Sequence, residues 1–254
     1  MGTTAPRELL QFALSVRSGS GLLSYRETAV SLTRLIPMPN GLRSFLQLQR
    51  GMLFQYGWLR SLRSGKPVDR HGRPVPWFSQ PAIDFLSQFD YRDKDVFEWG
   101  AGHSTLFWAA RCRSVVSIEN NPEWAAYLKD LVPSNVELIA SAPDNESYVG
   151  RIRGRGKFHI IVIDGTGYGR MPGAGEALDH LADGGMIILD DSDMLLQTTR
   201  FLRERLTQID FTGFRPGSGH AYATSIFFRT LDFKPLGVQP VLSPAQPNKP
   251  WQPE

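Results

Sequence analysis

The residues of this chain that could do chemistry follow short runs of β-branched residues. The string EWGAGHST contains Glu98, the glycines Gly100 and Gly102, and the hydroxyl residues Ser104 and Thr105. Glycines let the main chain turn sharply and let a ligand approach it, while Ser104 and Thr105 can cap a following helix. Thr105 stands where a dinucleotide-binding fingerprint needs its third glycine. The carboxylate of Glu98 would repel a pyrophosphate and attract a cationic ligand.

A second carboxylate fits the same kind of ligand. Glu119 ends the run SVVSIE, 17 residues after Gly102. This is near the spacing at which a carboxylate binds the two hydroxyls of a ribose. Together with Glu98 it favours a nucleoside that carries positive charge. S-adenosylmethionine, with its sulfonium, ammonium and adenosine, meets that description.

Three further carboxylates follow two later β-rich runs. Asp164 ends FHIIVID, and Asp190 and Asp191 end GMIILDD. On adjacent strands they would share one rim, where like charges raise each other's pKa unless a cation lies among them. The sulfonium and a divalent metal are both available, and an all-oxygen ligand set suits Mg²⁺, with Mn²⁺ or Ca²⁺ as alternatives. A reading without metal stays open, in which Asp191 caps the next helix and Asp164 orients the substrate or the cofactor amine.

The elements that position these residues are predicted from periodicity. Strands apolar along their whole length indicate a parallel sheet covered by helices, and they are expected at residues 95–100, 114–120, 135–140, 158–165 and 185–191. Asn121 caps a helix in which Trp124, Leu128 and Leu131 share a face. Another helix is expected within residues 194–206, and DFTGF and AYATSIFFR predict an antiparallel hairpin. The fold class is therefore α/β: a doubly wound, mostly parallel, seven-stranded sheet with an antiparallel closing strand.

The chain is expected to have three parts. Residues 1–80 predict a helical N-terminal cover, residues 81–234 the α/β domain, and residues 235–254 a proline-rich tail. Trp77 and Phe78 either pack the first helix of the domain onto the sheet or roof the pocket. The basic loop at residues 151–157 precedes a strand, so we expect it at the amino edge of the sheet as a solvated loop.

Charge and composition limit the possible partners and the possible classes of protein. The net charge is +3, yet residues 1–76 hold 11 Lys or Arg against three acids. Such a basic front can meet nucleic acid, a phosphorylated substrate or a membrane surface, although solvated faces of amphipathic helices are the stronger explanation. An apolar fraction of 41% and a charged fraction of 21% exclude a disordered or collagenous chain.

The cysteine count and the hydropathy bear on disulfides, cysteine metal clusters, membrane spans and cellular location. The single cysteine, Cys112, excludes an intramolecular disulfide and a cysteine metal cluster. No apolar run approaches the roughly 18 residues of a membrane span, and the start lacks a basic leader followed by an apolar stretch. A cytoplasmic location is the default expectation.

The quoted motifs carry a family resemblance. EWGAGHST followed by SIEN resembles the cofactor half of the class I S-adenosylmethionine-dependent methyltransferases, and the IDG and LDD strand ends with the closing antiparallel pair extend the likeness over residues 76–230. The resemblance implies a Rossmann-like fold, with Glu98, Gly100 and Gly102 at the methionine end. It also implies that Glu119 holds the ribose, that Asn120 lies beside the adenine, and that Ser141 or Asp144 adds a contact.

The later acids resemble those of the catechol-type, metal-dependent O-methyltransferases. In that family one Asp after the fourth strand and an Asp-Asn pair after the fifth hold magnesium, and Asp164, Asp190 and Asp191 fall on those positions with an acid replacing the amide. The lysine base of that family is Gly167 here. His220 or His103 would then act as base, unless the metal alone suffices.

The sequence therefore predicts methyl transfer to an oxygen of a small molecule or saccharide. The fourth strand ends in IDGTGYGR and lacks the NPPY or DPPY motif of the nucleic-acid amino-group methyltransferases, so an enzyme that acts on bases is disfavoured. Nucleic acid is also disfavoured as a partner, although the basic front keeps RNA open. Two rival functions stay open: a non-catalytic nucleoside-binding or scaffold relative of the fold, and an aminopropyltransferase. The sequence leaves the acceptor and the oligomeric state open.

Overall fold

The computed structural model describes residues 39–142, 145–165 and 167–237. The chain divides into two compact units, residues 1–46 and 47–254. The described part of the first unit is residues 39–46, which belong almost entirely to helix α3 (Asn40–Gln49). Residues 1–38 of the predicted cover, nearly all of the predicted tail, and Asp144 lie outside the described residues.

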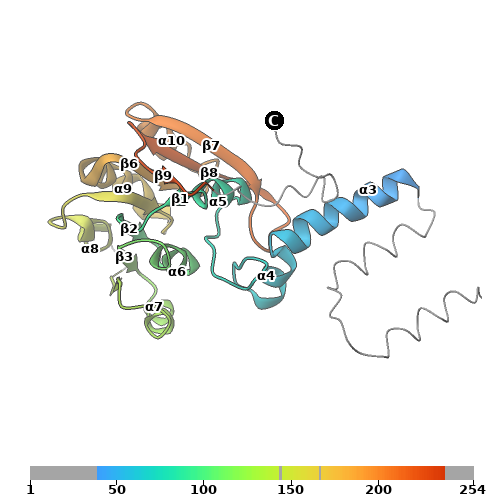
Figure 1. Ribbon diagram of the computed structural model, residues 1–254. Coiled ribbons are helices and arrows are strands. Elements are labelled where there is room, and N and C mark those ends of the chain that lie inside the picture. Colours follow the sequence, from blue (N-terminus) through green and yellow to red (C-terminus); the bar gives the residue numbers. More distant parts are fainter. Residues whose placement is uncertain (1–38, 143–144, 166, 238–254) are drawn as a thin grey trace, which may run out of the picture. The chain divides into compact units, whose positions relative to one another are not determined.

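The second unit is built on a seven-stranded sheet with the order β4-β3-β2-β5-β6-β8-β7 (Figure 1). Its first five strands in chain order are parallel, and β8 pairs antiparallel with both β6 and β7. The strands are β2 (Asp95–Trp99), β3 (Ser114–Glu119), β4 (Val136–Ala140), β5 (Phe158–Ile163), β6 (Leu181–Leu189), β7 (Thr207–Phe214) and β8 (Ala221–Phe228). The predicted fold class and the β7–β8 hairpin are confirmed.

Strand register brings the predicted site residues to one edge. Trp99 of β2 pairs with Ile118 of β3 and with Ile163 of β5, and Ile163 pairs in turn with Leu189 of β6. The residues that follow these positions therefore share the carboxyl rim of the sheet. The chain leaves β2 toward β3 on one side and leaves β5 toward β6 on the other. The strand order thus reverses between β2 and β5, which is where open α/β sheets bind ligands.

Helices cover both faces of the sheet, which explains the apolar strands. One buried cluster joins α5 (Gln80–Leu86) and α6 (His103–Ala109) to one face through Leu86, Phe107 and Trp108. The other joins α8 (Asn145–Val149), the 3₁₀ turn η2 (Gly150–Ile152), α9 (Gly167–His180) and α10 (Leu196–Arg203) to the opposite face. No helix among the described residues combines the length and the apolar character that a bilayer crossing demands.

Helix α7 (Pro122–Lys129) begins as predicted. The Asn121 side chain accepts hydrogen bonds from the backbone N–H groups of Glu123 and Trp124 at 3.0 and 3.1 Å. The predicted shared apolar face is only partly formed, because Leu128 is buried while Trp124 and Leu131 are exposed. The indole of Trp124 donates to the Ala101 carbonyl at 2.8 Å, so it lies toward the rim of the sheet and not in the core.

The segment that precedes α5 packs against the sheet within the second unit. It contains a π-helical turn η1 (Arg50–Gln55) and helix α4 (Trp58–Ser64). Phe78 is fully buried in the core, so it does not roof a pocket. The Trp77 indole donates to the Pro216 carbonyl at 2.8 Å. A two-residue strand β1 (Phe89–Asp90) pairs antiparallel with β9 (Lys234–Pro235).

Candidate functional site

A cavity of about 410 Å³ lies at the carboxyl rim, beside the point where the strand order reverses. Its size is within the range of small-molecule sites. Eight residues singled out from the sequence for the site contribute to its wall: Gly100, Gly102, Ser104, Glu119, Asn120, Asp164, the candidate base His103, and Trp77, which was one of two candidates to roof the pocket. The other lining residues are Gly65, Lys66, Pro67, Ala101, Trp124 and Gly165. The structure therefore gathers the glycine turn, the ribose candidate and one of the three aspartates around one cavity.

Gly100 and Gly102 are glycines for different physical reasons. Gly100 has a φ of +94°, and a Cβ there would lie 2.6 Å from the main-chain oxygen of Asp164. Packing between β2 and β5 therefore requires glycine at this position. Gly102 is extended, and a Cβ there would meet only the Ser104 hydroxyl, at 3.9 Å. Nothing in the described protein fills that space, so Gly102 leaves main chain open to a ligand in the cavity.

Glu98 lies one layer behind the cavity wall. It is fully buried, and its Oε2 accepts hydrogen bonds from Thr105 Oγ1 at 2.5 Å and Ser117 Oγ at 2.7 Å. Its Oε1 is buried with no hydrogen-bond partner among the described residues. Burial raises the pKa of Glu98 to about 7. The expectation that Glu98 lines the methionine end therefore changes: it acts on the cavity through its charge and through the residues in front of it.

Two other predicted cofactor residues also lie outside the wall. Thr105 Oγ1 accepts from the Gly102 N–H at 2.9 Å and so fixes the turn. Ser141 donates from its hydroxyl to the Ser147 carbonyl at 2.9 Å. Both residues are engaged in local hydrogen bonds and neither lines the cavity, so their contact with a cofactor stays a prediction.

Glu119 faces the cavity directly. Its Oε1 accepts from the Asn121 N–H at 2.7 Å. Burial raises the pKa of Glu119, and backbone N–H groups of Asn121, Asn120 and Ala101 partly offset that effect. Trp124 lies beside it in the wall. The sequence reading missed Trp124 because its helical spacing placed it on the core face, although its position five residues after Glu119 was a usable signal.

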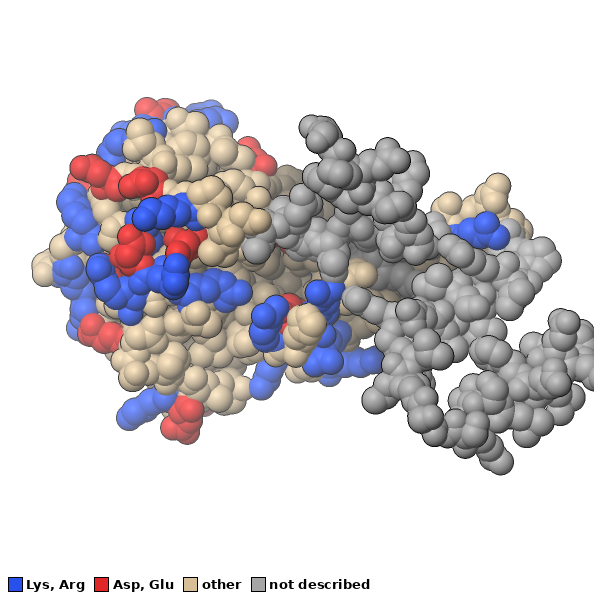
Figure 2. All heavy atoms as spheres, viewed as in Figure 1, with Lys and Arg blue, Asp and Glu red and all other residues tan. Residues whose placement is uncertain are grey.

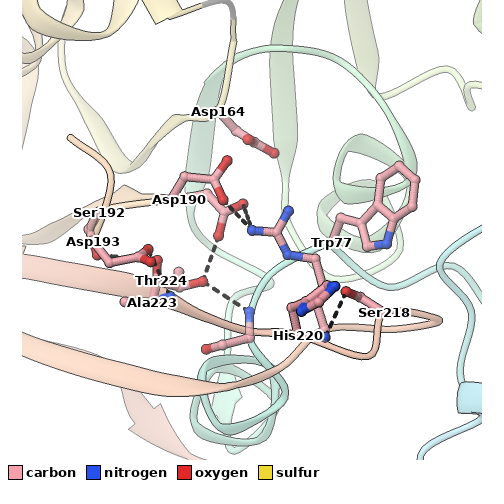
Figure 3. Close-up of polar contacts among 12 residues, drawn as sticks. Trp77, Asp164, Asp190, Ser192, Asp193, Ser218, His220, Ala223 and Thr224 are labelled. Carbon is pink, nitrogen blue, oxygen red and sulfur yellow. Dashed lines mark hydrogen bonds and ion pairs between the residues drawn. The ribbon is translucent and has the colours of Figure 1, made fainter.

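The three aspartates come together as the strand order predicts. One oxygen of each of Asp164, Asp190 and Asp191 lies within 4.8 Å of the others (Figure 3). Thr224 Oγ1 donates to Asp190 Oδ1 at 2.6 Å. Asp191 has a φ of 54°, which is uncommon for a residue with a side chain. Burial, and repulsion from Asp190, raise the pKa of Asp164 well above its usual range, and burial raises that of Asp190 to about 6.

Two arginines supply the positive charge that this cluster requires. Arg170 Nη2 lies 3.4 Å from Asp164 Oδ1 and 3.5 Å from Asp191 Oδ2. Arg215 pairs with Asp191 Oδ1, and its Nη2 lies 3.8 Å from Asp190 Oδ2. Each carboxylate thus faces a guanidinium already. The sequence reading named the sulfonium and a metal as the available cations and missed both arginines, although Arg170 follows Asp164 by six residues and Arg215 lies in the hairpin loop.

This arrangement fits a resident metal poorly. A divalent ion that bound all three aspartates would have to displace two guanidinium groups, whose contacts include bonds from Arg170 to the main-chain oxygens of Gly165 and Asp190. The geometric part of the prediction is met, because the carboxylates converge. The electrostatic part is met less well, because two guanidinium groups already offset two of the three negative charges that a metal would neutralise.

The two candidate histidines differ. His220 is exposed, and its backbone N–H donates to Ser218 Oγ at 3.3 Å. In Figure 3 it lies beside Ser218, apart from the Asp164 carboxylate, and it is not in the cavity wall. His103 does line the cavity, with Nδ1 2.9 Å from the Pro67 carbonyl oxygen. Burial lowers the pKa of His103, and a neutral ring that donates from Nδ1 keeps Nε2 free to accept a proton.

Comparisons with known proteins return structures but no sequence family. Neither a protein-family model nor a curated protein sequence matches the chain. A ribosomal RNA methylase from Streptococcus thermophilus is 18% identical, with a TM-score of 0.44, over 60% of this chain and 98% of that one. A methyltransferase from Pyrococcus furiosus is 22% identical, with a TM-score of 0.44, over 72% and 98%.

A third similar structure was solved with a ligand. The N-methyltransferase NodS from Bradyrhizobium japonicum, in complex with S-adenosyl-L-homocysteine, is 14% identical, with a TM-score of 0.41, over 53% of this chain and 76% of that one. The chain is thus similar to methyltransferases in fold. Because these identities are below 25% and these TM-scores below 0.5, the function has to be argued from the residues of the site.

Proposed function

We propose that this chain is an S-adenosylmethionine-dependent methyltransferase that methylates an oxygen of a sugar or small molecule. One observation carries the proposal: Glu119 and the open main chain at Gly102 face one cavity at the point where the strand order reverses. That edge is where α/β sheets hold nucleotides. A carboxylate in place of phosphate-binding groups selects a nucleoside without phosphates.

The wall offers complementary groups to each part of such a molecule. The Glu119 carboxylate can accept hydrogen bonds from the two ribose hydroxyls, and Asn120 lies next to it for the base. The buried charge of Glu98 favours a cation in front of it, because a nearby positive charge would lower the raised pKa of that carboxyl. S-adenosylmethionine supplies an electrophilic methyl group on a positively charged sulfur.

Asp164 is our candidate for the base. It lines the cavity, and burial together with repulsion from Asp190 raises its pKa, which makes its ionised carboxylate a stronger base than an ordinary aspartate. In the proposed reaction a lone pair on the acceptor oxygen forms the new bond to the methyl carbon. The carbon–sulfur bond breaks with its electron pair left on sulfur, and the hydroxyl proton passes to Asp164. The main task of the protein is then to hold the two reactants in line.

We also propose that the reaction needs no metal. Arg170 and Arg215 compensate Asp164, Asp190 and Asp191, so these acids form an ion-pair network that fixes the rim. Asp190 acts through its neighbours, since it is buried and bonded to Thr224. The magnesium site expected from the catechol-type resemblance is the competing reading, and addition of metal tests it.

Calorimetry with three ligands tests the proposal. The full-length protein is titrated with S-adenosylmethionine, S-adenosylhomocysteine and decarboxylated S-adenosylmethionine, alongside E119Q and the control E204Q, which changes an exposed acid at the C-terminal end of α10. We expect the first two ligands to bind the protein and E204Q alike, and E119Q to bind them weakly. Preference for the decarboxylated form would indicate an aminopropyltransferase. No binding of any form would favour a scaffold and overturn the proposal.

A further inference from the structure

Helix α4 and the loop that follows it, together called the loop at residues 57–77, display basic side chains at the mouth of the cavity. Residues 57–77 hold four arginines and one lysine against a single acid, Asp69. Figure 2 shows Lys and Arg side chains gathered over the region of α4 and the loop that follows it. Lys66 and Pro67 belong to the cavity wall, so the charged surface runs directly into the proposed active site.

The backbone of this loop is held rigidly. The Asp69 side chain accepts hydrogen bonds from the backbone N–H groups of His71 and Arg73 at 2.8 and 2.9 Å, and from Arg73 Nε at 2.7 Å. Val68 forms a bridge with Pro74. Gly57, with a φ of +72°, packs so closely on Asp69 that a Cβ would lie 2.3 Å from its carbonyl carbon. The one acid of the loop is therefore used to build the turn.

The remaining cations of the loop have no acidic partner within the described part of the chain. Arg70 bonds to His71 and to Gln55, and Lys66 to the Tyr127 hydroxyl. The basic loop at residues 151–157 is different, because its Arg153 pairs with Glu146 and Glu176, and its Arg155 with Glu137. Arg153 and Arg155 are thus neutralised by acids, whereas Arg60, Arg63 and Arg70 beside the cavity have no acidic partner among the described residues.

A fixed aromatic face lies between the loop and the cavity. Trp77 is 50% exposed, lines the cavity, and has its only polar atom engaged by the Pro216 carbonyl. Its ring is held in place while one face stays accessible. Arginines that follow a sugar–phosphate backbone, together with a ring on which a base stacks, are the combination that binds single-stranded nucleic acid. Arginine suits phosphate because its guanidinium forms paired hydrogen bonds.

We propose that the loop at residues 57–77 binds a single-stranded polynucleotide, which carries the acceptor of the proposed methyl transfer. The phosphates lie along Arg60, Arg63 and Arg70, and one nucleoside lies against Trp77 at the cavity mouth. The absent NPPY motif argues against methylation of a base amino group. It leaves a sugar hydroxyl of a polynucleotide available, which agrees with the oxygen chemistry proposed for Asp164. This inference rests on the proposed function for its choice of acceptor but not for the binding itself.

Fluorescence anisotropy with labelled oligonucleotides tests the surface. The full-length protein, R63Q/R70Q and the control R153Q/R155Q are titrated with single-stranded RNA and DNA over a range of salt concentrations. Each contact with a single-strand phosphate contributes about 0.7 to the slope of log K against log salt, so the test variant should lose about 1.4 from that slope. At 0.1 M salt this corresponds to about twenty-fold weaker binding, and the control variant should bind like the parent.

Other results would overturn the inference. Equal loss in both double variants would mean non-specific attraction to total charge. Binding to vesicles of anionic phospholipid but to neither oligonucleotide would assign the surface to a membrane. W77A should weaken binding about tenfold and W77F should restore it, because stacking on a ring is worth about 1–3 kcal/mol, and a thermal melt checks that each variant folds.

The test separates this inference from the proposed function. If S-adenosylmethionine binds and no oligonucleotide does, the surface proposal fails alone. If an oligonucleotide binds with the expected dependence on Arg63 and Arg70 while no nucleoside ligand binds, the polynucleotide surface stands and the methyltransferase assignment fails.

Discussion

Two groups of acids on one rim of this protein differ in the groups that surround them. Glu98 and Glu119 lie by the glycine turn, and hydroxyl and backbone N–H groups surround them without a guanidinium contact among the described residues. Asp164, Asp190 and Asp191 lie at the ends of the next strands and are held by Arg170 and Arg215. The first group lacks a cation, and the second already has two.

This difference shows how the same residue type serves two purposes. Burial without a counter-charge raises the pKa of a carboxyl, as for Glu98. A cationic ligand that binds nearby is therefore favoured, because it stabilises the ionised form. Burial with guanidinium groups creates a network that fixes side chains at the rim. The comparison predicts that ligand binding depends on the first group and that the stability of the rim depends on the ion pairs of the second.

The largest effect is expected from loss of Arg215. The variant R215M leaves the buried carboxylate of Asp190 and the neighbouring Asp191 without this partner, and breaking a buried ion pair costs about 3 kcal/mol of unfolding free energy. The guanidinium also stacks on Tyr222, 3.4 Å from its ring centre. R205M is a matched control, because Arg205 stacks on Phe201 in an exposed setting. Urea unfolding measures both.

A double variant built on R215M gives a further test of the difference between the two groups of acids. R215M/D191N should recover much of the lost stability, because it removes a charge along with its partner. If R215M unfolds at the same urea concentration as the parent, the second group is not held by its arginines and its difference from the first group disappears.

The next largest effect concerns Glu119. E119Q should bind S-adenosylmethionine about a hundredfold more weakly, because hydrogen bonds to a charged group contribute about 1.5–3 kcal/mol. D191N, an acid-to-amide change in the second group, should alter the affinity less than threefold if that group serves the rim. Calorimetry measures both. An equal loss in the two variants would mean that both groups contact the ligand.

A smaller effect is expected from Glu98 and pH. Burial raises its pKa from the ordinary 4.5 to about 7 in the folded protein, so the folded state holds the proton more tightly than the unfolded chain. The contribution of Glu98 to stability therefore falls as pH rises through this interval and stays low above it. E98Q should gain about 2 kcal/mol relative to the parent at pH 8 and little at pH 4. Unfolding at both values checks the sign.

Proton release on ligand binding gives a second test of Glu98. A cation bound in front of it would lower its pKa, so binding of S-adenosylmethionine near pH 7 should release protons from the parent and not from E98Q. Titrations in buffers of different ionisation enthalpy detect the release. If the two proteins release protons equally, Glu98 does not sense the ligand.

The smallest effect is expected from metal. Millimolar Mg²⁺ or Mn²⁺ should leave the Tm of the parent unchanged, because the acids that would bind it face arginines. R170M/R215M should instead gain stability on metal addition, since a ligand that binds only the folded state stabilises it. A clear rise in the Tm of the parent would restore the catechol-type magnesium site.

Local pattern made much of this protein readable. The apolar strands, the Asn121 cap and the β7–β8 hairpin follow from periodicity and turn residues, and the structure confirms them. The convergence of three aspartates from two strands also followed, because parallel strands end at one edge. Trp124 and the wall segment at residues 65–67 did not follow, because their place in the cavity depends on contacts between elements distant in sequence.

The sequence alone determined the order of the strands' apolar runs, the turn at Gly100 and the acids that end each strand, since these depend on residues close together in the chain. Only the tertiary structure decided what each acid faces. Arg215 comes 24 residues after Asp191 and meets it across the hairpin loop, and Glu98 is separated from the cavity by residues of its own turn. The sequence places a carboxylate at a given position, but its charge state depends on burial and on the neighbours that the fold brings to it.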